Sequence, residues 1–199
     1  MGDGIALDTA PIQRAIDAAS SAGGGVVWFG PGRYVTGTLL LKSGVTLDLA
    51  QDATLLGSTE PADYRLLEPF VDAVGATRGY ALVGCVDAHN VGITGAGIID
   101  GRGAMLQASG NKDPSARPFL LLCLRSTAVS IEGISLVNSG AWTMHVFQCS
   151  DVTISKIRIR SLGLANNDGI DIDSSLRVHV EGCTIATDDD AICLKTTSS

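Results

Sequence analysis

Three aspartates near the end of the chain have the type and spacing that acid–base chemistry requires. Asp168 closes the segment 166–168, whereas Asp189 and Asp190 end an acidic run over 188–190. Asp168 and Asp190 each precede a short strand pattern, and they stand 22 residues apart. If 22 residues make one turn of a coiled sheet, these two residues lie on neighbouring strands about 5 Å apart at the backbone. Carboxylates that close raise each other's pKa, so the arrangement is costly unless a reaction uses it.

Hydrolysis of a glycosidic bond uses this kind of cluster. One protonated carboxyl group donates to the leaving oxygen, and one ionised carboxylate activates water. Crowded acids separate their pKa values, which supplies both states at one pH. Aspartates are also common in turns, where they accept hydrogen bonds from nearby backbone amides. The spacing alone therefore leaves both a catalytic and a turn role open for Asp168, Asp189 and Asp190.

The strands that must position these acids recur along the chain. Similar units, each with two short runs of alternating apolar residues, begin at residues 91, 129, 152 and 178, which gives steps of 38, 23 and 26 residues. The longest step includes a polar insertion over roughly 102–118. Further strand patterns lie at 26–29, 39–41, 45–49, 144–147, 170–172 and 192–194. A period in the low twenties with several strands and almost no helix is typical of a solenoid. We predict an all-β, right-handed parallel β-helix.

One helix is expected, over residues 9–22. Ile12, Ala15, Ile16 and Ala19 fall on one face of it. Asp8 or Thr9 is expected to cap its start, and the glycines at 23–25 to end it. We expect this helix to cap the solenoid and to hide an open sheet edge.

Composition limits the classes that fit. The 199 residues are 45% hydrophobic and 5% aromatic, which suits one domain over 1–199 with an aliphatic core, its coils running over 26–199. A formal net charge of −7 argues against nucleic acid as the main partner. The sequence has no apolar run of about 18 residues, so we expect no membrane partner. It also lacks a signal-peptide pattern at its start.

The five cysteines are interpreted as free thiols that pack as small hydrophobes. Their odd number leaves at least one unpaired, and no two form a CxxC pair. No His/Cys group has metal-ligand spacing, so neither a metal nor another cofactor is expected.

An ordered set of motifs resembles glycoside hydrolase family 28, the polygalacturonase family. The similarity covers nearly the whole chain, in the segments GDGIALDTAPIQRAID, GVVWFGPGRYVTGTLLLKSGVTLDL, ATLLGST, GITGAGIIDGRG, RPFLLLC, IEGISLVNSGAWTMHVFQCSDVTI, NNDGIDI and DDDAICLK. The resemblance implies hydrolysis of α-linked galacturonan, with inversion, by a monomer that acts on an acidic polysaccharide. It also implies an extracellular or periplasmic location.

The resemblance assigns roles to single residues. The family's Asn-Thr-Asp motif falls on residues 166–168, with Asn167 in place of threonine, and its paired aspartates fall on Asp189 and Asp190. Asp189 would be the general acid, while Asp168 and Asp190 would hold the water and act as base. This first departure from the family pattern, like the second one described next, removes no catalytic carboxylate.

The second departure is Asp188, which stands where the family commonly has glycine or glutamine and is expected to raise the pKa of the acid. The family's Gly-His-Gly and Arg-x-Lys motifs have no counterpart up to Ser199. His89, His145 and His179 do not match the family histidine, and we expect His145 to be structural. The chain is thus expected to be the N-terminal part of a catalytic domain, weak or inactive alone.

Candidate substrate-binding residues are Asn166, Arg158 and Arg160. The two arginines alternate with Ile157 and Ile159, so they should point outward from one strand, where they could face uronate groups. A solvated strand face explains them equally well. Trp142 stands 26 residues before Asp168 and either lines the cleft or packs.

Three alternatives to galacturonan hydrolysis remain open at the level of sequence. A rhamnogalacturonan hydrolase would share the acids. A calcium-dependent pectate lyase would use β-elimination, and a non-catalytic β-helix would only bind polysaccharide.

Overall fold

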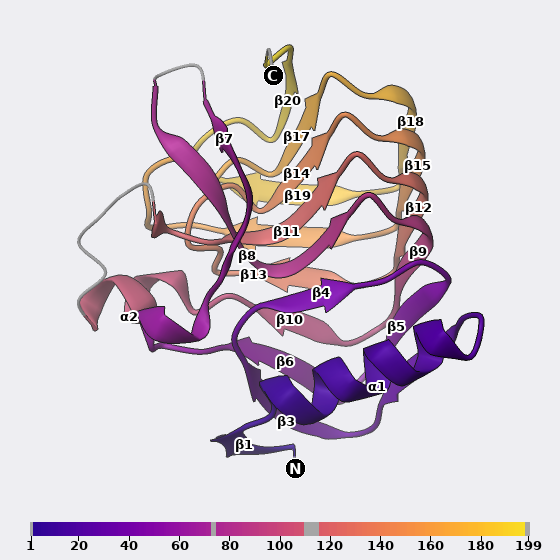
Figure 1. The fold of residues 1–199 in the computed structure, drawn as a ribbon. Coiled ribbons are helices and arrows are strands. Elements are labelled where there is room, and N and C mark those ends of the chain that lie inside the picture. The colour runs from indigo at the N-terminus through magenta and orange to yellow at the C-terminus, as the bar shows by residue number, and fades with distance from the viewer. Residues whose placement is uncertain (1, 73–74, 110–115, 198–199) are drawn as a thin grey trace.

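The chain winds into a right-handed parallel β-helix, as predicted (Figure 1). The computed structural model describes residues 2–72, 75–109 and 116–197. Three parallel sheets run along the axis. Sheet A contains, in spatial order, β1 (Asp3–Leu7), β3 (Gly32–Thr36), β6 (Ala53–Gly57), β10 (Ile98–Asp100), β13 (Ser135–Val137), β16 (Arg158–Ser161) and β19 (Thr184–Thr187).

The other two sheets complete each coil. Sheet B contains β2 (Gly25–Phe29), β5 (Val45–Leu49), β9 (His89–Gly95), β12 (Thr127–Glu132), β15 (Ser150–Ser155) and β18 (Leu176–Glu181). Sheet C contains β4 (Leu39–Leu41), β8 (Thr77–Val86), β11 (Phe119–Leu124), β14 (Met144–Phe147), β17 (Ile170–Asp173) and β20 (Ile192–Lys195). A regular coil therefore runs from sheet C through sheet B to sheet A, and a loop then leads into the next strand of sheet C.

Aliphatic side chains stack inside the coils because alternate residues of each strand point inward. One inner column of sheet B consists of Leu47, Ile93, Ile131, Ile154 and Val180. The matching column of sheet A consists of Leu55, Ile99, Leu136, Ile159 and Ile185. These residues belong to, or pack against, one continuous core, and their burial stabilises the fold by roughly 25 cal/mol per Å² of apolar surface.

The corners of the coils use left-handed backbone conformations at repeated positions. Between sheets C and B, one column consists of Asp87, Arg125, Gln148 and Ser174, with φ between 46° and 53°. Three residues further along each coil, a second column consists of Asn90, Ala128, Asp151 and Arg177, with φ between 52° and 58°. Such values cost non-glycine residues about 1–2 kcal/mol each. The cost is tolerated because every coil must turn at the same place to stay in register.

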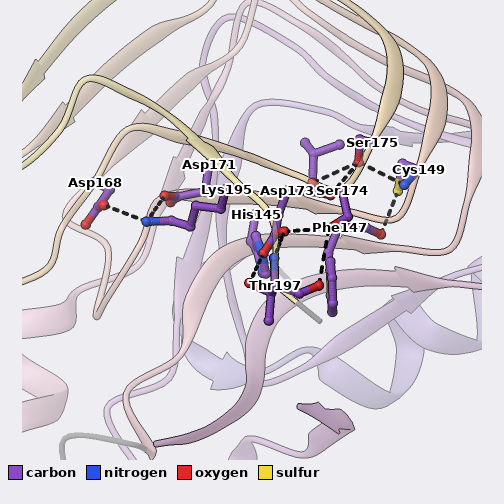
Figure 2. Close-up of polar contacts among 11 residues, drawn as sticks. His145, Phe147, Cys149, Asp168, Asp171, Asp173, Ser174, Ser175, Lys195 and Thr197 are labelled. Atoms are coloured by element: carbon purple, nitrogen blue, oxygen red, sulfur yellow. Dashed lines mark hydrogen bonds and ion pairs between the residues drawn. The ribbon is translucent and has the colours of Figure 1, made fainter. Parts of the chain in front are cut away.

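Hydrogen bonds between coils reinforce that corner. The amide of Ala88 donates to Ser126 Oγ at 3.1 Å, and the amide of Ser126 donates to Cys149 Sγ at 3.4 Å. The amide of Cys149 in turn donates to Ser175 Oγ at 2.9 Å (Figure 2). Each buried amide thus finds its partner on the following coil, which satisfies a group that would otherwise be costly to bury.

The predicted helix is α1 (Thr9–Ser21), and it packs Ile12 and Ile16 onto the first coil. Gly23 and Gly24 end it with positive φ, as predicted. The expected side-chain cap is wrong, because neither Asp8 nor Thr9 bonds back to the helix. Asp8 occupies the N-cap position but accepts a hydrogen bond from the amide of Gly2 instead.

The helix covers the open edge of β4. Gln13 Nε2 donates to Leu40 O at 2.9 Å, and Leu40 N donates to Gln13 Oε1 at 2.8 Å. This amide therefore pairs with the free edge of β4 as a neighbouring strand would. Helix α1 also contacts β2, whose outward-facing Val26 and Trp28 are exposed.

Three of the described elements, β7, α2 and η1, were not expected from the sequence. Strand β7 (Leu66–Val71) pairs antiparallel with β8 and folds over the outer face of sheet C (Figure 1). There Leu67 and Phe70 pack on a second apolar cluster that includes Phe119 and Trp142. The short helix α2 (Gly103–Ala108) begins the insertion expected over 102–118, of which 110–115 lie outside the described residues. A 3-10 turn, η1, spans Pro61–Asp63.

The two ends of the described chain differ in exposure. Below the first coil lies α1, whereas the last coil leaves Leu176, Ile192 and Leu194 exposed, the last at 79% (Figure 1). All five cysteines are free, and Cys85, Cys123 and Cys149 are buried. None of the described helices has the length and hydropathy that crossing a membrane requires.

Candidate active site

Asp168 and Asp190 lie side by side on consecutive coils, as their spacing predicted. The amide of Gly169 donates to Asp190 O at 2.8 Å, and the amide of Ile170 donates to Ala191 O at 3.0 Å. On the other side, the amide of Thr143 donates to Asp168 O at 2.7 Å. The loops leading into β17 and β20 are therefore in register, and 22 residues make one coil.

The close approach of these coils depends on Gly169. A methyl group added there would lie 2.3 Å from Ala191 O and 2.7 Å from Ile185 Cγ2. Both distances are far below van der Waals contact, so any side chain would push the two loops apart. The absence of a side chain at residue 169 thus helps to bring the carboxylates of consecutive loops together.

Three carboxylates meet at this place. One oxygen from each of Asp168, Asp189 and Asp190 can be chosen so that all lie within 4.8 Å of one another. One water molecule can bridge two oxygens at that separation, since each of its hydrogen bonds spans about 2.8 Å. The structure therefore brings together the three aspartates that the sequence singled out.

The three acids differ in their surroundings. Asp168 is buried, with 4% of its surface exposed, whereas Asp189 and Asp190 are exposed. Burial is the main cause that raises the pKa of Asp168, and the nearby charge of Asp189 adds to it, while Lys195 acts in the opposite direction. Oδ1 of Asp168 has no hydrogen-bond partner in the described protein. A buried acceptor of this kind is suited to orienting a water molecule.

Lys195 and a second buried carboxyl group, that of Asp171, lie next to Asp168. Lys195 Nζ is 2.9 Å from Asp171 Oδ1 and 3.6 Å from Asp168 Oδ2 (Figure 2). Asp171 alternates with the inward-facing Ile170 on β17 and so points outward, yet it is fully buried. Burial first, and then the charge of Asp168, raise the pKa of Asp171 to about 7.

Further along β17, a buried histidine and carboxylate form a separate network. His145 Nε2 lies 3.3 Å from Asp173 Oδ2, and both side chains are fully buried (Figure 2). His145 is enclosed by aromatic rings, among them Phe147 at 5.3 Å. Burial lowers the pKa of this histidine. These contacts support the structural role that the sequence suggested for His145.

Arg117 holds the loop that carries Asp168, and sequence reasoning did not single it out. Its buried guanidinium donates to Ala165 O at 2.6 Å, Gly140 O at 3.2 Å and Asn166 Oδ1 at 3.3 Å. It thereby ties the loop before β14 to the loop before β17. The only signal in the sequence was its place in the RPFLLLC segment that carried the resemblance.

The two unusual residues of the acidic motifs also have structural partners. Asn167, in place of the expected threonine, is buried and donates from Nδ2 to Ser161 O at 2.6 Å. Asp188 Oδ2 accepts a hydrogen bond from the amide of Gly163 on the preceding loop. Both side chains thus fix the loops that hold the acids.

The candidate substrate-binding residues occupy different positions. Asn166 is exposed beside the acids and bonded to Arg117. Arg158 and Arg160 point outward from β16, as predicted, but they lie on sheet A rather than on the loops leading into sheet C. In the described part of the chain neither forms an ion pair with the three aspartates. Trp142 is packed rather than open, since its ring stacks on Phe119 at 5.1 Å.

The acidic groups have the chemistry to hold a hard cation as well as water. Besides the three aspartates, Asp168, Asp171 and Cys193 bring ligand atoms within 4.8 Å of one another. Calcium prefers six to eight oxygen ligands. Lys195 already supplies positive charge to the second group, which makes that group poorly suited to a metal ion.

Comparisons with known proteins agree with this geometry. The family model for glycosyl hydrolases family 28 matches residues 44–199. A probable polygalacturonase of Vitis vinifera is 31% identical over 98% of this chain and 42% of its own length. An exo-poly-alpha-D-galacturonosidase of Dickeya chrysanthemi is 41% identical over 51% of this chain and 18% of its own length.

The solved structures agree too. The hyperthermoactive exopolygalacturonase of Thermotoga maritima superposes with a TM-score of 0.85 and 27% identity, over 98% of this chain and 52% of that one. The chain thus spans less than half the length of both curated relatives and about half of the solved one. Since the family model matches well over half of its residues, and the motifs it was expected to share meet in one site, the chain belongs to glycosyl hydrolases family 28.

Proposed function

We propose that the protein hydrolyses α-glycosidic bonds in the galacturonan backbone of pectin. The observation that carries this proposal is the meeting of Asp168, Asp189 and Asp190 within 4.8 Å across two in-register coils. The names of the relatives from Vitis vinifera and Dickeya chrysanthemi support galacturonan as the substrate.

In this mechanism each acid has one role. Asp189, which is exposed, donates a proton to the leaving oxygen. Asp168 and Asp190 hold a water molecule between them and remove its proton as it attacks the anomeric carbon. The bond to the leaving sugar breaks as the new bond to water forms, and the leaving hydroxyl carries away the proton from Asp189.

The stereochemical outcome belongs to the same proposal. Inverting glycosidases usually hold their two carboxyl groups about 6.5–9.5 Å apart, with water between acid and base. Here the nearest oxygens lie closer, within 4.8 Å. We place the water between Asp168 and Asp190 and propose inversion of the anomeric centre on the ground of the family resemblance, because a separation this short is not the spacing typical of inverting enzymes.

The proposal extends to the setting of the reaction. On the ground of the family resemblance, we propose that the protein acts outside the cell or in the periplasm, on plant cell-wall pectin, and as a monomer. We propose that three side chains contact uronate groups of the polysaccharide: the outward-pointing Arg158 and Arg160 and the exposed Asn166. Neutral or cationic polysaccharides should then bind more weakly.

We also propose that the cleft is completed by coils beyond β20. The apolar side chains Leu176, Ile192 and Leu194 are exposed on the last described coil, where a further coil would bury them. The share of the relatives' length that the chain spans supports the same idea. Activity is therefore best measured in the full natural protein.

The reaction class is tested by its products. Incubation of the full protein with polygalacturonate should release reducing ends, without products that absorb in the near ultraviolet and without loss of rate in excess chelator. The first product should have the inverted anomeric configuration by proton NMR. Ultraviolet-absorbing products that require calcium would instead identify a lyase, and binding without any products would identify a non-catalytic β-helix. Faster release from rhamnogalacturonan would identify the rival substrate.

A further inference from the structure

Lys195 occupies an unusual position for a lysine at the end of a strand. Its side chain returns along the outer face of sheet C, so that Nζ lies 2.9 Å from Asp171 Oδ1 and 3.6 Å from Asp168 Oδ2. The same ammonium lies 4.4 Å from the ring centroid of Trp142, two coils away. Figure 2 shows it pointing from β20 toward both carboxyl groups. A cation over an aromatic ring is held by the charge of the ring face.

The charges at this place do not cancel. Asp171 is fully buried and Asp168 nearly so, and two buried carboxylates would repel strongly in this environment. Among the described residues Lys195 alone forms ion pairs with either of them. One ammonium thus serves two acids, so only one of the two can readily be ionised.

The other titratable groups around Asp168 add no positive charge. Asp189 and Asp190 approach it from the loop before β20, and Cys193 lies beside Asp171 on β20. His145, on β14, is the neighbour of Asp171 in register. Burial lowers its pKa, and its Nε2 is engaged with Asp173. Burial opposes the ionisation of Asp168, and a backbone hydrogen bond and then the charge of Lys195 favour it.

We propose that Lys195 is a positioning residue that keeps Asp168 in its ionised, water-binding form, with Asp171 as a neighbour that competes for the same ammonium. The inference rests on the proposed function, in which Asp168 is part of the base. Trp142 takes part by holding the ammonium between the two acids. Removal of Lys195 leaves Asp168 beside Asp171, Asp189 and Asp190 with no compensating charge.

Electrostatics give the direction of the change. Lys195 lowers the pKa of both Asp168 and Asp171, against the burial that raises them. An opposite charge within about 4–6 Å shifts a carboxyl pKa by about 1–3 units. Without the ammonium, Asp168 should hold its proton to higher pH, so the acidic limb of the kcat/KM profile should move to higher pH by about 1–3 units.

The experiment compares variants of the full protein. In Lys195→Met, the pKa of the acidic limb of the kcat/KM profile should rise by at least about 1 unit. The value of kcat/KM on the high-pH plateau should fall less than its value at about pH 5. Lys195→Arg should restore most of the wild-type profile, because a guanidinium also stacks on tryptophan and pairs with carboxylates. Lys42→Met is the matched control, since Lys42 forms an exposed pair with Asp17 beside α1; its profile should not move.

A second variant protects the test against misfolding. Asp171→Asn removes a buried acid with little change of shape, so it should fold. In this variant the pKa of the acidic limb of the kcat/KM profile should not rise. The carboxyl titration near pH 7, followed by NMR of ¹³C-labelled aspartate, should disappear. A drop of activity at all pH values in Lys195→Met with an unshifted limb would mean a structural role only and would overturn the inference.

Failure of the proposed function would give a different result. If the wild-type protein released no reducing ends, the reaction would be wrong, yet the NMR titration of Asp168 in Lys195→Met would still report on the ammonium. An unchanged pKa of Asp168 in that variant would reject the positioning role whatever the substrate is.

Discussion

The three aspartates of the site differ mainly in how far each is shielded from water. Asp168 is buried beside Lys195, whereas Asp189 and Asp190 are exposed. Acids in different environments take different protonation states at one pH, which is what a reaction with one donor and one base needs. At the residue scale, then, the role of each carboxyl group depends on its neighbours. For Asp168, Lys195 supplies the charge and Arg117 fixes the position of the loop.

Arg117 provides a prediction at this scale. Arg117→Lys keeps the charge but cannot reach Ala165 O, Gly140 O and Asn166 Oδ1 together, because an ammonium lacks the planar set of donors. We expect kcat/KM on polygalacturonate to fall about 10- to 100-fold, since small displacements of a catalytic group are costly. Arg125→Lys is the control: Arg125 pairs with Asp87 at an exposed corner, and its replacement should leave the rate within about twofold. Equal rates for both variants would argue against a role for Arg117 in placing the loop.

At the scale of elements, the loops before β17 and β20 decide whether the acids meet. Their approach needs Gly169, which faces Ala191 O on the next coil. The regular corners between sheets C and B keep these loops in register from coil to coil. The site is therefore a consequence of the repeat rather than of a special insertion.

Gly169→Ala tests that dependence. The added methyl group must push the two loops apart, so we expect a loss of about 1–3 kcal/mol in the free energy of unfolding and a fall in kcat/KM. Gly25→Ala is the matched control, because a methyl group there meets its nearest neighbour at 3.7 Å, an ordinary contact. Denaturant unfolding and steady-state rates measure both. Normal stability and rate in Gly169→Ala would show that the coils are not held this closely.

The sequence predicted the parts of this fold that depend on local pattern. Alternation placed Ile157 and Ile159 inside and Arg158 outside, and the 22-residue step placed Asp168 beside Asp190. It did not predict the hairpin of β7 and β8, because this depends on which distant surface is free to pack, and the side-chain cap that it predicted for α1 does not form. The contacts of Lys195 with Trp142 were also beyond it, since they join residues two coils apart through a flexible side chain.

At the scale of the whole molecule, the β-helix converts a one-dimensional repeat into a surface that carries the site on consecutive coils. Each coil adds one rung to sheet C, and the outer face of that sheet carries Asp171, Lys195 and the rings beneath them. An extended surface of this kind suits a polymer better than a small metabolite.

The proposed acid role of Asp189 is tested by comparing two neighbouring acids in the full protein. Asp189→Asn should lower the release of reducing ends from polygalacturonate by at least about 10²-fold, because proton donation to the leaving group is lost. Asp188→Asn should change it by less than about threefold, since the asparagine oxygen can still accept the hydrogen bond from Gly163. Circular dichroism should show that both variants are folded. Near-normal turnover in Asp189→Asn, or an equal loss in Asp188→Asn, would contradict the account.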